Sequence, residues 1–296
     1  MADPVIKLPA QFDGQTLSKV AADVVACCKD GFPGKLIFDF AQLDFVRPAG
    51  VVFLSNLINW LSENGTKAGF INCDPRRQAV KYLDDSLFFE QHSGSKLSQS
   101  STPRDTTRPL LKIAQKDSHE WLEANFVPWL AARLNITQAS LYALKVCISE
   151  LFNNIQDHTR YDIGSIYVQH FPREHSITIS VSDFGLGIPA KVREKIPDIH
   201  DGDAIVQAVQ DGFTTKSKPA NKGAGLDYLL NVVVLQNKGN VTVYSGHSIV
   251  EFENANGVVH PTVSDNVGFS PGTTIDIEIR TDTIEELPEE REELQW

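Results

Sequence analysis

The first ninety-five residues alternate short apolar runs with segments of helical periodicity. Strands are predicted at 5–8, 35–40 and 67–72, with helices at 16–28, 51–61 and 75–83. Within the first helix, Leu17, Val20 and Val24 recur at helical spacing. Strands that alternate with helices favour parallel or mixed pairing. We therefore predict an α/β domain over residues 1–95.

A polar stretch follows this domain. From His92 to Arg108 the chain is rich in Ser and Thr and poor in apolar residues, which is typical of a linker. We predict a linker over 96–108 and a second domain over 109–284.

The second domain opens with helical patterns, of which Thr137–His158 is the strongest. Its strands are predicted at 165–171, 176–183, 240–245, 248–252 and 273–280. They alternate apolar and polar residues and come mostly in hairpin-like pairs. The pattern predicts an α/β sandwich, with a mixed sheet that carries helices on one face.

The charge is acidic and unevenly spread. Lys and Arg number 27 against 38 Asp and Glu, a net charge of −11. Residues 285–296 hold six Glu and one Arg, or −5, so we expect a solvated acidic tail. The acidic balance argues against binding to nucleic acid or to anionic membranes.

The remaining composition indicates a cytoplasmic protein. No apolar run approaches the roughly 18 residues that a membrane span needs. The start, Met1 to Pro4, lacks the basic and apolar regions of a signal peptide. Four cysteines show no C-x-x-C pair, so we expect reduced thiols and no structural zinc.

The first candidate for chemistry lies on the helix at 137–158. Glu150, Asn154 and His158 are spaced four residues apart and share one face, with Asp157 at its edge. Such a face can hold a hydrated Mg²⁺ and activate a water or hydroxyl group. A solvated amphipathic helix would carry the same pattern.

The second candidate is the end of the strand at 176–183. Asp183 is followed by Gly185 and Gly187, which let the backbone turn closely around a ligand. A carboxylate there can accept a hydrogen bond from the exocyclic amine of adenine. The same residues are also common turn chemistry.

The third candidate combines lysines with glycines before a helix. Lys216, Lys218 and Lys222 precede Gly223 and Gly225. Backbone N–H groups at a helix start favour phosphate, although a glycine pair alone identifies nothing.

Together, in this order, the motifs resemble the sequence boxes of the Bergerat-fold (GHKL, HATPase_c) family. E-L-F-N-N-I-Q-D-H resembles its N box, D-F-G-L-G-I-P and K-G-A-G-L its glycine boxes, and Gly272-Thr273 its final G-T element. Gyrase-type ATPases, mismatch-repair ATPases, sensor histidine kinases and anti-sigma-factor serine kinases share these boxes. The resemblance covers roughly residues 110–282 and implies binding of ATP with Mg²⁺.

Carried over residue by residue, the resemblance implies a role for each matching position. It implies that Asn154 binds Mg²⁺ and that Asp183 recognises adenine, in a pocket shaped by Gly185, Gly187 and Thr273. It also implies that Gly223 and Gly225 form the hinge of a lid and contact phosphate, with further phosphate contacts from Lys216 and Lys222. Glu150 falls where the hydrolysing and serine-phosphorylating branches keep a general base, and Asp157 matches a position that is acidic in the gyrase-type branch. Ala224–Asp227 lacks the further glycine that the family often has.

Residues 1–95 resemble a STAS domain, the module of sulfate transporters and anti-sigma-factor antagonists. The run L-I-F-D-F-A-Q-L-D-F-V-R-P-A-G carries the resemblance. Arg47–Gly50 stand where the family can carry a phosphorylatable serine, and they contain no hydroxyl group. The resemblance therefore implies an interaction module for a protein partner.

These expectations leave three functions open. The first is a cytoplasmic, Mg²⁺-dependent ATPase or ATP-driven signalling switch. The second is a serine/threonine kinase of the anti-sigma type that acts on a separate protein. The third is a non-catalytic module whose partner surface changes with nucleotide. A homodimer is also plausible, because Bergerat-fold ATPases often pair.

Overall fold

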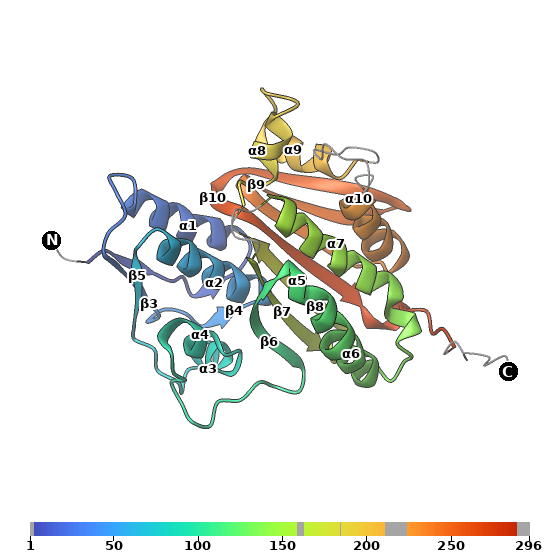
Figure 1. Cartoon of the computed structure of the whole chain (residues 1–296), viewed down its shortest axis with the longest axis horizontal. Helices are drawn as coiled ribbons and strands as arrows, with labels where there is room; N and C mark the ends of the chain where they lie inside the picture. Colours follow the sequence, from blue (N-terminus) through green and yellow to red (C-terminus); the bar gives the residue numbers. More distant parts are fainter. Residues whose placement is uncertain (1–2, 159–162, 184, 211–223, 289–296) are drawn as a thin grey trace.

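The protein is a mixed α/β structure in which two larger sheets, of three and five strands, lie side by side (Figure 1). The computed structural model describes residues 3–158, 163–183, 185–210 and 224–288. Among these residues, no helix is both long and apolar enough to cross a membrane.

The N-terminal half is built around a parallel sheet of order β1-β3-β5, as its alternating pattern predicts. Its strands are β1 (Val5–Lys7), β3 (Lys35–Asp39) and β5 (Lys67–Ile71), with a short parallel pair of β2 (Gln11–Phe12) and β4 (Phe45–Val46). Its helices are α1 (Gln15–Cys27), α2 (Pro48–Glu63), α3 (Gln78–Asp85) and α4 (Phe88–Ser93).

The central helix of this half, α2, is buried on nearly every side. Twelve of its sixteen residues are buried, so no continuous polar face remains for solvent. It begins at Pro48, whose fixed φ suits the first turn of a helix. A helix that is apolar all round must be covered on several sides, and α2 is covered by its own sheet and by the second one.

The second sheet has the order β6-β7-β8-β10-β9. Its strands are β6 (Thr107–Ala114), β7 (Ile163–Phe171), β8 (Ser176–Asp183), β9 (Asn240–Ala255) and β10 (Val258–Arg280). Every described pairing in it is antiparallel, so the prediction of a mixed sheet was wrong. Short turns join β7 to β8 and β9 to β10, and such turns can only connect antiparallel strands.

The hairpin of β9 and β10 is much longer than its apolar segments predict. The strands expected at 240–245 and 248–252 form one strand, and the strand expected at 273–280 begins at Val258. Its register shifts between Asp265 and Thr273. At that irregularity Ser270 Oγ lies 2.8 Å from Ser18 Oγ of α1, so a distant helix supports the hairpin.

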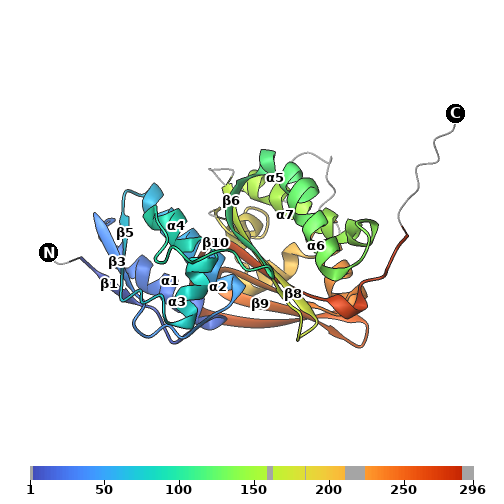
Figure 2. The same ribbon diagram turned by 90° about the horizontal axis from the view of Figure 1, so that it is seen from below.

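The sheet's own helices gather on one face (Figure 2). They are α5 (Gln115–Trp121), α6 (Val127–Leu134), α7 (Tyr142–His158), α8 (Ile188–Arg193), α9 (Asp201–Ala208) and α10 (Ala224–Leu230), with π-helical turns at Leu122–Phe126 and Asn231–Gln236 and short 3₁₀ turns at Ala139–Leu141 and Thr281–Thr283. Alternate residues of β8, Ile177, Ile179 and Val181, enter the core beneath these helices.

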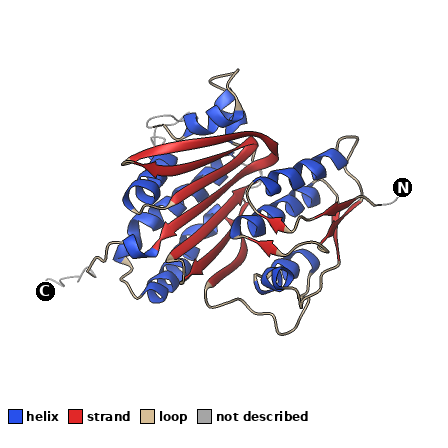
Figure 3. Ribbon diagram, turned by 180° about the vertical axis from the view of Figure 1, so that it is seen from behind, coloured by secondary structure: helices blue, strands red, loops and turns tan. Residues whose placement is uncertain are grey.

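The opposite face of the sheet is rich in hydroxyl groups, and α1 and α2 pack against it. On β8 this face carries Thr178, Ser180 and Ser182, all buried. Figure 3 shows the strands in front of their helices, with the N-terminal half against one end of the sheet. Tyr167 and Tyr244 of the second sheet belong to the core of the N-terminal half, so the two halves share packed surface.

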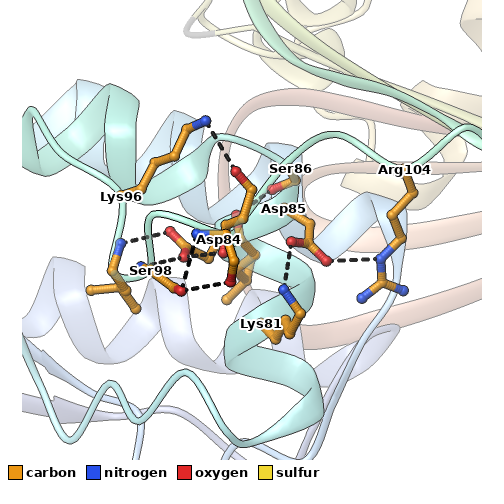
Figure 4. Close-up of polar contacts among 11 residues, drawn as sticks. Lys81, Asp84, Asp85, Ser86, Lys96, Ser98 and Arg104 are labelled. Carbon is orange, nitrogen blue, oxygen red and sulfur yellow. Dashed lines mark hydrogen bonds and ion pairs between the residues drawn. The ribbon is translucent and has the colours of Figure 1, made fainter.

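The segment predicted as a linker is bound to the N-terminal half by a buried carboxylate (Figure 4). Asp84 of α3 is fully buried and accepts hydrogen bonds from the N–H groups of Leu97 and Ser98, each at 2.9 Å, and from Ser101 Oγ at 2.5 Å. Arg104 donates from Nε to the neighbouring Asp85 at 3.1 Å. The stretch is thus held along its length, although its composition is that of a loop.

Candidate functional site

Asp183 stands at the end of β8 and is the first element of the candidate site. Alternation along the strand places its side chain on the same face as Ile179 and Val181, toward the helices. Its Oδ1 accepts the N–H of Gly185 at 2.6 Å. The aspartate therefore closes its own turn and stays partly exposed.

The environment of Asp183 raises its pKa to about 6. Desolvation is the main cause, and the backbone N–H groups of Gly185 and Thr273 oppose it only in part. The group is therefore ionised at neutral pH while it has lost much of its water. A carboxylate in that state favours any ligand that can donate hydrogen bonds to it.

Two glycines allow the loop after β8 to approach the strand β10. Gly187 has a φ of +82° and Gly272 a φ of +69°, values that side chains other than glycine rarely adopt. A Cβ on Gly187 would lie 2.7 Å from Ser245 Oγ and 2.9 Å from Gly272 O. A Cβ on Gly272 would overlap the carbonyl oxygen of Asp183. Glycine is thus required at both positions for steric as well as conformational reasons.

Ser245 of β9 joins the two loops, a role that no sequence motif indicates. Its Oγ donates to Gly272 O at 2.8 Å, accepts the N–H of Ile188 at 3.0 Å, and lies 3.3 Å from Thr273 Oγ1. Ser245 and Thr273 are direct partners in the ladder between β9 and β10. Only that register could have drawn attention to a serine within a strand.

Glu150 and Asn154 form a second group, on α7. A Cβ on Gly225 would lie 3.5 Å from Asn154 Nδ2 and 3.5 Å from Glu150 Oε2, so the start of α10 lies directly beside both side chains. Asn153 Nδ2 lies 3.5 Å from Glu150 Oε1. Both Glu150 and Asn154 are partly exposed and can reach a ligand.

The two groups lie toward the same end of the sheet. Gly164 of β7 is the ladder partner of Asp183, and β7 starts only five residues after the end of α7 at His158. The last turns of α7 therefore lead toward the strand end that carries Asp183. Figure 1 shows α7 and α10 together above this sheet.

Several predicted site residues cannot be compared with these groups. Lys216, Lys222 and Gly223 lie outside the described residues, and Asp157 is described only as part of the backbone of α7.

The face of α7 that carries Asn154 offers an oxygen ligand for a metal ion. Within the described ranges, no three His, Cys, Asp or Glu side chains gather as a metal site. Mg²⁺ is usually bound through one or two protein oxygens together with phosphate and water. The amide oxygen of Asn154 can supply one such ligand.

Comparison with known proteins adds no family assignment. The chain matches no protein-family model and no curated protein.

Proposed function

We propose that the second half is a Bergerat-type domain that binds ATP with Mg²⁺ and hydrolyses it or transfers its γ-phosphoryl group, and that the first half is a STAS-like interaction module. The observation that carries the proposal is the junction at Asp183. There the D-F-G-L-G loop, the G-T element and Ser245 pack together around one partly exposed carboxylate. The D-F-G-L-G loop and the G-T element are more than eighty residues apart in sequence, and adenine recognition requires that they lie together.

In this proposal each group of residues has its own task. Asp183 accepts a hydrogen bond from the exocyclic amine of adenine, while Gly185, Gly187 and Thr273 shape the pocket around the base. Asn154 is the Mg²⁺ ligand. When bound, Mg²⁺ neutralises charge on the phosphates.

Glu150 is the candidate catalytic base. Its carboxylate orients a water molecule and accepts its proton as the water oxygen attacks the γ-phosphorus. The bond between that phosphorus and the bridging oxygen breaks, and ADP and phosphate leave. In the kinase alternative, a hydroxyl group of a separate protein takes the place of water.

The first half does not offer an acceptor for such a transfer at the position where STAS domains can carry one. Gly50 lies in the first turn of α2, and a Cβ there would lie 2.7 Å from Phe12 O and 2.8 Å from Val46 Cγ2. Glycine is therefore required at Gly50, while Pro48 and Ala49, the two residues before it, carry no hydroxyl group. This supports an interaction role for the first half and a separate protein as any phosphoryl acceptor.

Replacing Glu150 by Gln tests the catalytic part of the proposal. We expect Glu150→Gln to bind Mg-ATP with nearly wild-type affinity and to lose turnover by about a hundredfold or more, because a general base contributes roughly 10²–10⁴ in rate. Asn154→Ala and Asp183→Asn should instead weaken ATP binding. Calorimetry measures the affinity, and release of labelled phosphate measures turnover.

The exposed Glu174→Gln in the turn between β7 and β8 is the matched control and should change neither quantity. Turnover that survives in Glu150→Gln would exclude Glu150 as the base. Unchanged affinity in both Asn154→Ala and Asp183→Asn would refute the site. Adding cell extract to the assay separates the alternatives, since a kinase leaves label on protein and an ATPase releases only free phosphate.

A further inference from the structure

Asn56 is a polar side chain in the middle of the apolar helix α2. It is 3% exposed and lies where α2 crosses the hydroxyl-rich face of the second sheet. Its neighbours in sequence, Leu54 and Leu57, are buried core residues. A buried amide is normally hydrogen-bonded, so the contacts of Asn56 should show why a polar side chain occupies this position.

The amide of Asn56 holds the end of β8. Nδ2 lies 2.5 Å from the carbonyl oxygen of Asp183 and 2.8 Å from Ser182 Oγ. Ser182 Oγ lies 2.6 Å from Thr274 Oγ1, the hydroxyl group beside Thr273. One side chain of the N-terminal half thus contacts the strand that carries Asp183 and, through Ser182, the strand that carries the G-T element.

Stability alone does not account for an asparagine here. The Oδ1 atom of Asn56 is buried and has no hydrogen-bond partner among the described residues. An amide that uses only its donor loses the hydration of its acceptor without compensation, which an apolar side chain of the same size would avoid. What Asn56 contributes is the pair of hydrogen bonds that its Nδ2 donates to Asp183 O and Ser182 Oγ of β8.

Asp183 is therefore contacted from both faces of its sheet. Its carboxylate accepts the N–H of Gly185 on the face that the helices cover, and its carbonyl oxygen accepts the hydrogen bond from Asn56 on the other side. Gly272 packs against the same carbonyl oxygen. A shift of α2 would move the backbone of Asp183, and with it the carboxylate of its side chain.

We infer that Asn56 is a positioning residue for recognition of the base, and that through it the docking of the N-terminal half sets the affinity for the adenine part of the nucleotide. This inference rests on the proposed function. The coupling is reciprocal, because a base that binds better when Asn56 holds β8 also stabilises that contact. It acts on the base and leaves the phosphate contacts near Asn154 and Gly225 unchanged.

Two partial ligands test this inference on the full-length protein. Adenosine probes the Asp183 side of the site, and inorganic triphosphate with Mg²⁺ probes the α7 and α10 side. In Asn56→Leu, which keeps the size and removes the donor, we expect the affinity for adenosine to fall about tenfold, as for the loss of one buried hydrogen bond. The affinity for triphosphate should not change.

The matched control is Tyr82→Phe. The Tyr82 hydroxyl group donates to Gln169 Oε1 at 2.9 Å, so this change removes another hydrogen bond between the two halves, far along β7 from Gly164 and Asp183. It should leave both affinities unchanged. If Asn56→Leu does not fold, Asn56→Ser, which is too short to reach Asp183, takes its place.

The outcomes separate the inference from the proposed function. An unchanged adenosine affinity in the Asn56 variant, or an equal loss for both ligands, overturns the positioning role and leaves the ATP site standing. If the wild type binds neither adenosine nor triphosphate, the proposed function fails and the inference fails with it.

Discussion

At the scale of single residues, the fold alters the ionisation of Asp183, the carboxylate of the candidate site. Two backbone N–H groups favour its ionised form, yet desolvation outweighs them and raises its pKa to about 6. The contribution of Asp183 to the stability of the free protein therefore falls as the pH rises from about 4 to about 6, because over that range the folded carboxyl group holds a proton that the unfolded one has lost.

The same pKa predicts a pH-dependent affinity for adenosine, which has no phosphate groups to titrate. Between pH 7 and pH 5 the ionised share of a group with a pKa of about 6 falls from roughly nine-tenths to roughly one-tenth. We expect the affinity to fall by up to about tenfold over this range. Titration by calorimetry at several pH values measures it.

Asp183→Asn provides the control for other titrating groups. Its weaker binding should be nearly independent of pH between 5 and 7. A wild-type affinity that is also flat would mean that the ionised carboxylate does not contact the base.

At the scale of elements, the stretch between the two halves is held by side-chain contacts, chiefly those of Asp84, rather than by secondary structure. Asp84 receives three hydrogen bonds from residues 97–101, and Lys96 Nζ donates to Ser101 O at 3.0 Å. Just before this stretch in the sequence, Phe88 and Phe89 of α4 lie in the core of the N-terminal half. The segment is therefore part of the folded N-terminal half.

Asp84→Asn should release this segment. The amide keeps the size of the carboxylate but turns a donor toward backbone N–H groups, so we expect the free energy of unfolding to fall by about 3 kcal/mol. Urea titration measures that change. Trypsin cleavage after Lys96 and Arg104 should also become faster.

Asp30→Asn, at an exposed position after α1, is the control and should affect neither measurement. Wild-type protection of Lys96 and Arg104 in Asp84→Asn would show that other contacts hold the segment.

The sequence predicted the elements whose pattern is local. Apolar spacing was enough for α7, β7 and β8, whose observed bounds lie within a few residues of the predicted ones. The strand β6 was missed because it follows directly on a Ser- and Thr-rich stretch. The first half of β10 was missed because its residues, such as Pro261 and Asn266, do not favour strands, and contact with α1 supports them instead.

The same distinction holds for the candidate site. Asp183, Gly187 and Gly272 could be named from short motifs, because each marks a turn with its own sequence. Ser245 and Asn56 could not. The role of a serine within a strand depends on strand register, and the role of an asparagine in a helix depends on the packing of α2 on β8.

At the scale of the whole molecule, the two halves share one packed interior. Leu110, Tyr167, Tyr244, Ile249 and Val267 of the second half belong to the core of the first. Tyr82 and Gln169 add a polar contact across the same boundary. Neither half can lose its structure without exposing surface of the other.

We therefore predict a single unfolding transition. Trp60 lies in α2, and Trp129 lies in α6 on the far side of the second sheet. Two variants, each retaining one of these residues while the other tryptophans are replaced by Phe, should show the same midpoint in urea within error. Fluorescence measures both, and two separate midpoints would show that the halves unfold independently.

The ribosome makes α2 well before the surface that buries it. Between Glu63 and Arg280 lie 217 residues of further synthesis, or roughly 10 to 40 s at about 5–20 residues per second. During that time the apolar sides of α2 meet water, whereas the serine-rich face of β8 tolerates water whenever it emerges. The risk of aggregation of the nascent chain is therefore concentrated in its first half. This risk ends when β10 is complete and the second sheet covers α2.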